Sequence, residues 1–495
     1  MKLDWDIVEG LLTILDSCNE LVKCFQMVRD RVKQDSLIPI KLVIKAARSG
    51  DGRHQNMPTA GEIAGLIVGN IEDTIGIRDI IVDDCKLGLT RISDLHSSFM
   101  AMQYPLLFPY GEDGFRLGVE LNQNTNNAQK KGKKLHTWRK LLQTYIMDLM
   151  TCIEEERLHW VKVNQSKIRA ELYCGIKDAL HRGDTEGAQV GKRIVLPSSF
   201  TGGPRYMTQN YQDAIALCRV MGNPDLFITV TSNPKWNKIL EFLRNNGGQR
   251  PNERPDIVAR VFKIKLDSLM EDLQKNNHFG KCIVAVYTIE FQKRGLPHAH
   301  ILIWLHPAHR YPTPAKIDEI IVAEIPDKTK DPVGYDVVSK YMTHGLCGQV
   351  APRSPCMKNL KCTKHFPKKY INQTCIDDAG FPIYRRRCDE NVWVEKGGIK
   401  LDNSYVVPYN RNLIVKYQAH INVEWCNRGR SIKYLFKYIT KGPDYVSASL
   451  QHISNNAASS SNAKERLDEV QYYLDCRYIS APESIWRIYG FDIYY

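Results

Sequence analysis

The feature that most constrains the fold is a pair of apolar segments between residues 283 and 305, joined by a short polar turn. Residues 283–291 read IVAVYTIEF and residues 298–305 read HAHILIWL, and both are strand-length runs rich in β-branched and aromatic residues. The sequence QKRGLP between them contains a glycine and a proline, as turns often do. This arrangement predicts an antiparallel β-hairpin, which requires a sheet around it and a cover over its apolar face.

The rest of the pattern predicts an α+β protein. The run DLFITVTSNP over residues 225–234 predicts a second buried strand, and helices are expected near residues 236–243 and 256–275. We expect a mainly antiparallel sheet formed by residues 206–320 and completed by residues 405–445, with helices over one face. The apolar spacing after Trp138 predicts a helical N-terminal region ahead of the sheet.

Composition changes along the chain divide it into five predicted segments. They are a mixed N-terminal region (1–120), a polar linker followed by helices (121–205), the sheet core with the hairpin (206–320), a Cys-rich basic insert (321–404), and the rest of the core (405–495). The last residues, GFDIYY, are apolar and aromatic, which suggests a truncated tail and a reading frame that once continued.

Two histidines in the predicted hairpin point to metal chemistry. His298 and His300 are two apart on a strand, so both imidazoles face the same side. Glu290 and Gln292 have the same spacing on the preceding strand and can lie opposite them, Glu290 being the favoured third ligand and Gln292 the alternative. Such a set suits Mg²⁺ or Mn²⁺ acting on a phosphodiester. The alternative is a pair of ordinary half-buried histidines; a histidine-triad hydrolase is disfavoured because Leu302 occupies the third position.

A second candidate group is the sequence KYLFKYITKG over residues 433–442. Tyr434 and Tyr438 are four apart, so they share one face if this segment is helical, and Lys437 and Lys441 repeat that spacing. A tyrosine can attack phosphorus and form a covalent ester, helped by nearby positive charge. The alternative is that both rings are core aromatics.

The insert contains candidate ligands for a structural Zn²⁺ site. They are Cys347, Cys356, Cys362 and His365. Three thiolates and one imidazole suit a closed site, although the spacing is not that of a standard zinc finger, and free thiols are the alternative. Basic side chains that could grip phosphates, or form a solvated basic face, surround them: Lys361, Lys364, Lys368, Lys369, Arg385, Arg386 and Arg387.

Charge and hydropathy narrow the class of protein further. The net charge of +13 favours a polyanionic partner. The sequence shows neither a segment of about 20 apolar residues nor a signal-peptide pattern, so we expect an intracellular protein whose 14 cysteines are thiols or metal ligands. The lysines at 130, 131, 133 and 134 form a weak nuclear-entry signal, consistent with an expected nuclear location.

Taken in chain order, the strand at residues 227–233, the His298/His300 pair and the Tyr434/Tyr438 pair resemble the three motifs of His-hydrophobic-His endonucleases. The sequence around these motifs resembles even more closely the Helitron helicase-like N-terminal region of rolling-circle transposases. The similar segments are DGRHQNMPTAGEIAGLIVG, MQYPLLFPYGEDGFR, LPSSFTGGPRYMTQNYQDA, DLFITVTSNPKW, EFQKRGLPHAHILIWL and KYLFKYITKG. The resemblance covers nearly the whole chain and is strongest over residues 195–495.

This resemblance implies a nuclease core of the His-hydrophobic-His type and a metal-dependent DNA nickase and strand transferase. It would cut single-stranded DNA at transposon ends, with Tyr434 or Tyr438 forming a 5′-phosphotyrosine link and freeing a 3′-OH. Family members continue into a helicase, but the nearest candidate for a phosphate-binding loop here, GAQVGKR at 187–193, has the wrong spacing and Arg in place of Ser or Thr. The rivals are a metal phosphodiesterase that uses water and a non-catalytic DNA-binding remnant.

Overall fold

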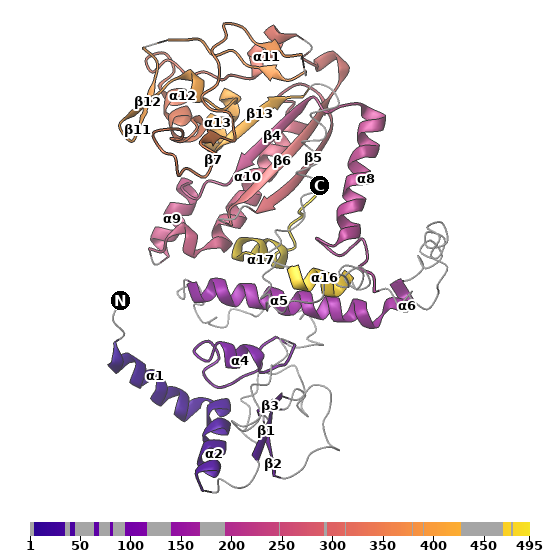
Figure 1. Cartoon of the computed structure of the whole chain (residues 1–495), viewed down its shortest axis with the longest axis vertical. Helices are drawn as coiled ribbons and strands as arrows, with labels where there is room; N and C mark the ends of the chain where they lie inside the picture. The colour runs from indigo at the N-terminus through magenta and orange to yellow at the C-terminus, as the bar shows by residue number, and fades with distance from the viewer. Residues whose placement is uncertain are drawn as a thin grey trace, which may run out of the picture. The chain divides into compact units, whose positions relative to one another are not determined.

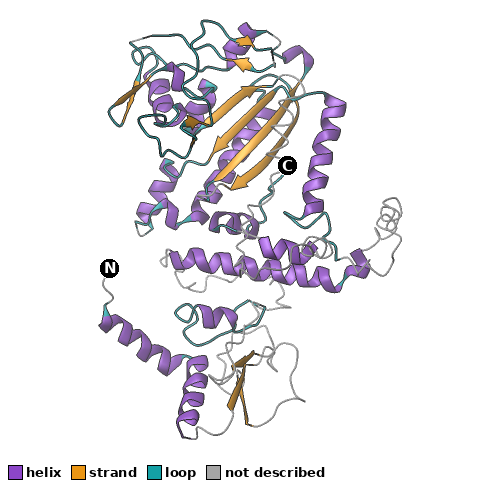
Figure 2. Cartoon of the chain, in the orientation of Figure 1, coloured by secondary structure: helices purple, strands orange, loops and turns teal. Residues whose placement is uncertain are grey.

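The structure is a computed structural model, and the chain divides into two compact units, Met1–Lys167 and Ile168–Tyr495 (Figure 1). It describes residues 4–34, 40–44, 64–68, 80–82, 95–115, 140–168, 194–246, 248–291, 295–311, 313–378, 380–389, 391–426, 469–476 and 479–495. Both units mix helices with strands (Figure 2).

The first unit contains a small antiparallel sheet with the strand order β2-β1-β3. Its elements are α1 (Trp5–Cys18), α2 (Glu20–Gln34), β1 (Ile40–Ile44), β2 (Ala64–Val68), β3 (Ile80–Val82), α4 (Phe99–Gln103), α5 (Lys140–Val163) and α6 (Gln165–Ile168), which reaches the boundary. The apolar residues Met100, Tyr104 and Leu107 pack with Cys152 of α5. This contact confirms that the periodic apolar residues after Trp138 are the buried side of a helix.

The second unit is built around a four-stranded sheet. Its larger elements are α8 (Pro204–Met221), β4 (Leu226–Thr231), α9 (Asn237–Asn245), α10 (Pro255–Gln274), β5 (Cys282–Phe291), β6 (Pro297–Leu305), α11 (Pro314–Ile320), α12 (Pro332–Val337), α13 (Arg411–Tyr417), β13 (Ile421–Trp425), α16 (Glu469–Cys476) and α17 (Ala481–Ile488). Short elements fill the insert and the connections: η4 (Pro251–Glu253), η5 (Pro307–His309), η6 (Val338–Met342), β7 (Met357–Lys358), β8 (Lys361–Cys362), β9 (Cys375–Ile376), β10 (Pro382–Ile383), β11 (Val394–Lys396), β12 (Ile399–Leu401) and η7 (Asn403–Tyr405).

The four strands are antiparallel throughout, in the order β13-β4-β6-β5. The predicted hairpin is present as β5 and β6, and β6 is buried along its whole length because β4 pairs with its other edge. The second predicted strand is β4, and residues 421–425 complete the sheet as β13, within the predicted range. The predicted α+β class with an antiparallel sheet is therefore confirmed, whereas the five-segment division of the chain stays a prediction.

The sequence predicted helices over one face of the sheet, but in the structure helices lie on both faces. Ala214 of α8 packs against Phe227, Leu302 and Trp304, which share the face that carries the histidines. The opposite face is covered by α10, which contacts β5 and β6 and lies behind the sheet in Figure 1. The second cover exists because β6 is apolar on both sides between Ile301 and Leu305, so each face excludes water.

The end of the chain pairs with the exposed edge of β5. The backbone N–H of Tyr287 donates to the carbonyl of Tyr495 at 3.0 Å, and that of Ile289 donates to the carbonyl of Ile493 at 2.8 Å. The rings of Tyr287 and Tyr495 stack with centroids 5.2 Å apart. The aromatic tail thus satisfies an edge whose backbone groups would otherwise need another partner.

Of the helices that the structure describes, none has both the length and the apolar character needed to cross a membrane.

A charged group ties α13 to α10 and makes stability depend on pH. Asp272 of α10 accepts hydrogen bonds from Lys416 and from the Tyr417 hydroxyl, both at 2.6 Å from Oδ2. Burial alone would raise the pKa of Asp272, but the bonds from Lys416, Tyr417 and Asn276 outweigh burial and hold the pKa below its ordinary value. The folded state therefore favours the charged carboxylate.

We expect Asp272→Asn to lower the free energy of unfolding by about 1–3 kcal/mol at neutral pH, because a charged acceptor is lost. A depressed pKa contributes stability that is present above the unfolded value of about 3.9 and disappears as pH falls through the folded value. Urea unfolding followed against pH should show the wild type and the variant converging below about pH 4. Asp267→Asn, at a more exposed aspartate of the same helix, is the control. A constant gap down to acid pH would contradict this assignment.

Candidate functional site

The alternation of β6 places His298 and His300 side by side on one face of the sheet. They are 6% and 8% exposed, so both rings are largely withdrawn from water. Ala299 and Ile301, between and after them, face the opposite side and are fully buried. The strand therefore presents two imidazoles at its N-terminal end, while Leu302 and Trp304 on the same face anchor α8.

Glu290 is the predicted acidic partner that the structure brings to this pair. It lies opposite His298 in the register of β5 and β6, and its Oε2 is 3.0 Å from Nε2 of His300. The alternative ligand, Gln292, lies outside the described residues. Two imidazoles and one carboxylate on adjacent strands form the set of donors that the sequence pattern predicted, and such a set can hold a divalent cation.

Two threonines that the sequence reasoning missed hold the histidine rings in place. Thr231 Oγ1 lies 3.0 Å from Nδ1 of His298, and Thr229 Oγ1 lies 3.2 Å from Nδ1 of His300. Both threonines are on β4, each directly opposite the histidine that it contacts. A hydrogen bond at Nδ1 fixes the orientation of the ring and assigns Nε2 to the ligand side. The signal was present in the sequence, because Thr229 and Thr231 have the same two-residue spacing as the histidines.

The ring of Phe227 lies between this polar group and the apolar core under α8. It is stacked with His300, with centroids 5.7 Å apart and an interplanar angle of 8°. Phe227 also packs with Leu302 and Trp304 under α8. The face therefore changes from polar to apolar at His300, which separates the candidate metal ligands from the core.

The edge strand β13 continues the polar surface away from the histidines. His420 precedes β13 and accepts the backbone N–H of Thr231 at 3.0 Å through its carbonyl. Burial lowers the pKa of the His420 ring to about 4, so the ring is neutral at physiological pH. Farther along, Glu424 accepts a hydrogen bond from the Tyr384 hydroxyl at 2.8 Å, and burial raises the pKa of its carboxyl. Insert residues thus contact the β13 edge of the sheet, which is separated from the histidine strand β6 by β4.

The predicted tyrosine pair belongs to the part of the chain after β13. Tyr434, Tyr438, Lys437 and Lys441 all lie outside the described residues. In the chain they follow β13, whose last residue is Trp425, so the segment that carries them starts from the edge strand of the same sheet.

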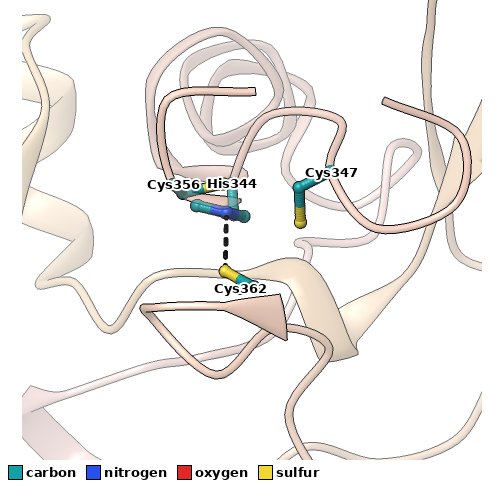
Figure 3. Close-up of side chains that lie close together, drawn as sticks. All are labelled: His344, Cys347, Cys356 and Cys362. Carbon is teal, nitrogen blue, oxygen red and sulfur yellow. Dashed lines mark hydrogen bonds between the residues drawn. The ribbon is translucent and has the colours of Figure 1, made fainter. Parts of the chain in front are cut away.

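Three of the four predicted zinc ligands come together in the insert (Figure 3). The ligand atoms of His344, Cys347, Cys356 and Cys362 all lie within 4.8 Å of one another, and His344 Nε2 is 3.6 Å from Cys362 Sγ. The histidine is therefore His344, and His365 was the wrong choice for this group. The side chain of His365 is exposed, on a residue with a positive φ of 56° at the turn after β8, where its N–H bonds the carbonyl of Cys362.

The surroundings of this Cys/His group are aromatic and positively charged. The ring of Phe366 stacks on His344 with centroids 4.2 Å apart. Burial, followed by the charges of Lys364, Lys368 and Lys396, lowers the pKa of His344, so these lysines lie near the group. No disulfide involves any cysteine in the described parts of the chain, which is consistent with thiols or metal ligands.

The predicted basic surface of the insert is divided between exposed and structural side chains. Lys361, Lys364 and Lys369 are exposed. Arg386, by contrast, is buried and donates to the carbonyls of Tyr384 and Val406. Its neighbour Arg387 binds the Glu324 carboxylate at 2.6 Å. The exposed lysines are therefore better candidates for phosphate contacts than Arg386.

The fold and this site define an α+β protein whose antiparallel sheet bears a His-hydrophobic-His pair beside a glutamate. Residues 121–303 match the family model described as the Helitron helicase-like domain at N-terminus, which relates this part of the chain to Helitron proteins. The match ends within β6, after both histidines, and includes Glu290, Thr229 and Thr231. A comparison with curated proteins gave no match.

Proposed function

We propose that this chain is a single-strand DNA endonuclease and strand transferase of a Helitron-type rolling-circle transposon. The observation that carries the proposal is the His298, His300 and Glu290 group inside a segment that matches the Helitron domain. Each ring is oriented through Nδ1 by a threonine, as is usual for histidines that bind metals through the other nitrogen. The net charge of +13 favours a polyanionic partner, for which we propose single-stranded DNA, with a nuclear location.

The donors fit a divalent cation such as Mg²⁺ or Mn²⁺. Two imidazoles and a carboxylate leave coordination positions for water and a phosphate oxygen. When bound, the cation would supply Lewis acidity at the scissile phosphate. The threonines and the stacked Phe227 would keep the two rings in one orientation throughout the reaction.

The proposed chemical step is a transesterification by Tyr434 or Tyr438. The phenol oxygen forms a bond to phosphorus, and the bond from phosphorus to the upstream 3′ oxygen breaks. The tyrosine loses its proton, and the leaving oxygen gains one to become a 3′-OH. The number of phosphorus–oxygen bonds is unchanged, so the tyrosine ester keeps the energy needed for strand transfer to a second DNA end. Lys437 and Lys441 would lower the cost of the phenolate and of the phosphate charge.

The test uses labelled single-stranded DNA that carries a Helitron-like end, incubated with Mn²⁺ and separated on a denaturing gel. Wild-type protein should form a protein–DNA adduct that survives denaturation. We expect Tyr434→Phe and Tyr438→Phe each to impair cleavage or transfer and the double variant to form no adduct, because no phenol remains to attack. Tyr417→Phe, at a buried structural tyrosine in the same unit, is the matched control and should retain the adduct.

Other outcomes would replace the proposal. Cleavage without an adduct in the wild type would indicate a phosphodiesterase that activates water, with Tyr434 and Tyr438 structural. Binding without cleavage under any divalent metal would indicate a DNA-binding remnant. An adduct that persists in the double variant would assign the nucleophile to another residue.

A further inference from the structure

We propose that His344, Cys347, Cys356 and Cys362 bind one structural Zn²⁺ ion, and that this ion fastens the insert to the edge strand of the sheet. The ligand atoms already lie within 4.8 Å of one another, with His344 Nε2 directed at Cys362 Sγ (Figure 3). Ligands of a tetrahedral zinc ion are roughly 3.5 Å apart, so small side-chain movements would complete the site.

The donor set selects the metal and the kind of site. Three thiolates and one imidazole are soft ligands that favour Zn²⁺ over Mg²⁺ or Mn²⁺, which prefer oxygen. Four protein ligands leave no position for water or substrate, so the site is structural rather than catalytic. Cys347 and Cys362 are buried and His344 lies against the ring of Phe366, which fits a closed site.

The positive charge near the group favours the metal-bound form, which is negative. Three thiolates and a neutral imidazole around Zn²⁺ carry a net charge of about −1. Lys364, Lys368 and Lys396 lie near His344, and their positive charges would compensate it. With neutral thiols and no ion, the same lysines would face a group without negative charge.

The ligands come from two segments that the ion would join. Cys356 precedes β7 and Cys362 ends β8, so both belong to one small hairpin. His344 and Cys347 follow η6, where the backbone N–H of His344 donates to the carbonyl of Tyr405 at 2.8 Å. Zinc would therefore hold the β7–β8 hairpin against the segment around Tyr405.

That segment is bonded directly to the sheet. Val407 donates to the carbonyl of Met342, and Val423 of β13 donates to the carbonyl of Pro408 at 3.1 Å. Backbone hydrogen bonds between a few residues thus link the zinc ligands to β13. Zinc would stabilise the edge strand from which the segment with Tyr434 and Tyr438 continues.

The test measures metal content in the full chain and does not depend on nuclease activity. We expect one zinc per chain by mass spectrometry of the purified protein, released by a thiol-reactive mercurial. Co²⁺ exchanged into the wild type should give the thiolate-to-metal charge-transfer and d–d absorption of a tetrahedral site. Cys362→Ser and His344→Ala should lose this metal. The matched controls His365→Ala and Cys388→Ser should keep it, as should His298→Ala.

A second measurement tests the fastening. Removing zinc should increase hydrogen exchange in residues 356–362 and 403–409 and in β13 more than in β5 and β6. Zinc retained by Cys362→Ser, or lost equally from His365→Ala, would overturn the ligand assignment. If Cys362→Ser does not fold, the wild-type cobalt spectrum still decides, because a spectrum without thiolate bands would exclude the site.

Discussion

If the chain nicks single-stranded DNA as proposed, His298→Ala and His300→Ala are each expected to reduce nicking by at least about 10²-fold, because each removes a proposed metal ligand and loss of an orienting partner alone costs about 10–100-fold. Both side chains are buried on one face of β6. Initial rates against Mn²⁺ concentration, with binding of the same DNA measured in parallel, check this expectation.

The two threonines provide a graded comparison. Thr231→Val keeps the shape of the side chain but removes its hydrogen bond to His298, so we expect a loss of about 10-fold and a higher Mn²⁺ requirement. Thr208→Val, at an exposed threonine of α8, should behave as wild type. Equal rates for wild type and His298→Ala at all metal concentrations would contradict a metal role for the pair.

Trp304→Ala is expected to destabilise the second unit by about 3–5 kcal/mol. Trp304 is 1% exposed and packs with Ala214, Phe227 and Leu302, so truncation leaves a cavity between α8 and the sheet. It also removes the hydrogen bond from the indole N–H to the carbonyl of Gly222, 2.9 Å long, at the end of α8.

Urea unfolding followed by circular dichroism measures this loss. Ile264→Ala, at a side chain of α10 that is 66% exposed, is the control and should change stability by no more than about 0.5 kcal/mol. A loss below about 1 kcal/mol for Trp304→Ala would mean that α8 does not depend on this contact.

Much of the sheet could be predicted because its signal is local. The hairpin of β5 and β6 follows from two-residue alternation on either side of a Gly/Pro turn, and this alternation also places His298 and His300 together. The threonines could have been found in the same way. The strand that carries the threonines, β4, was predicted, but its pairing with β6 was not, because this pairing joins residues about 70 positions apart.

The zinc ligands show where local reasoning fails. His365 was chosen because only two residues separate it from Cys362, yet its side chain is exposed to solvent at the turn after β8. Two residues also separate His344 from Cys347, so spacing along the sequence does not distinguish the two histidines. The choice is made by the pairing of His344 with Tyr405 and by the stacked Phe366, which are contacts set by the fold.

The most direct test of the central claim is to locate the DNA on the protein. The adduct formed with Mn²⁺ is digested with nuclease and protease and analysed by tandem mass spectrometry. The account predicts a nucleotide attached through its 5′ phosphate to Tyr434 or Tyr438, with a 3′-OH on the released strand. Attachment to another residue, a 3′ linkage, or cleavage that leaves no modified peptide would contradict it.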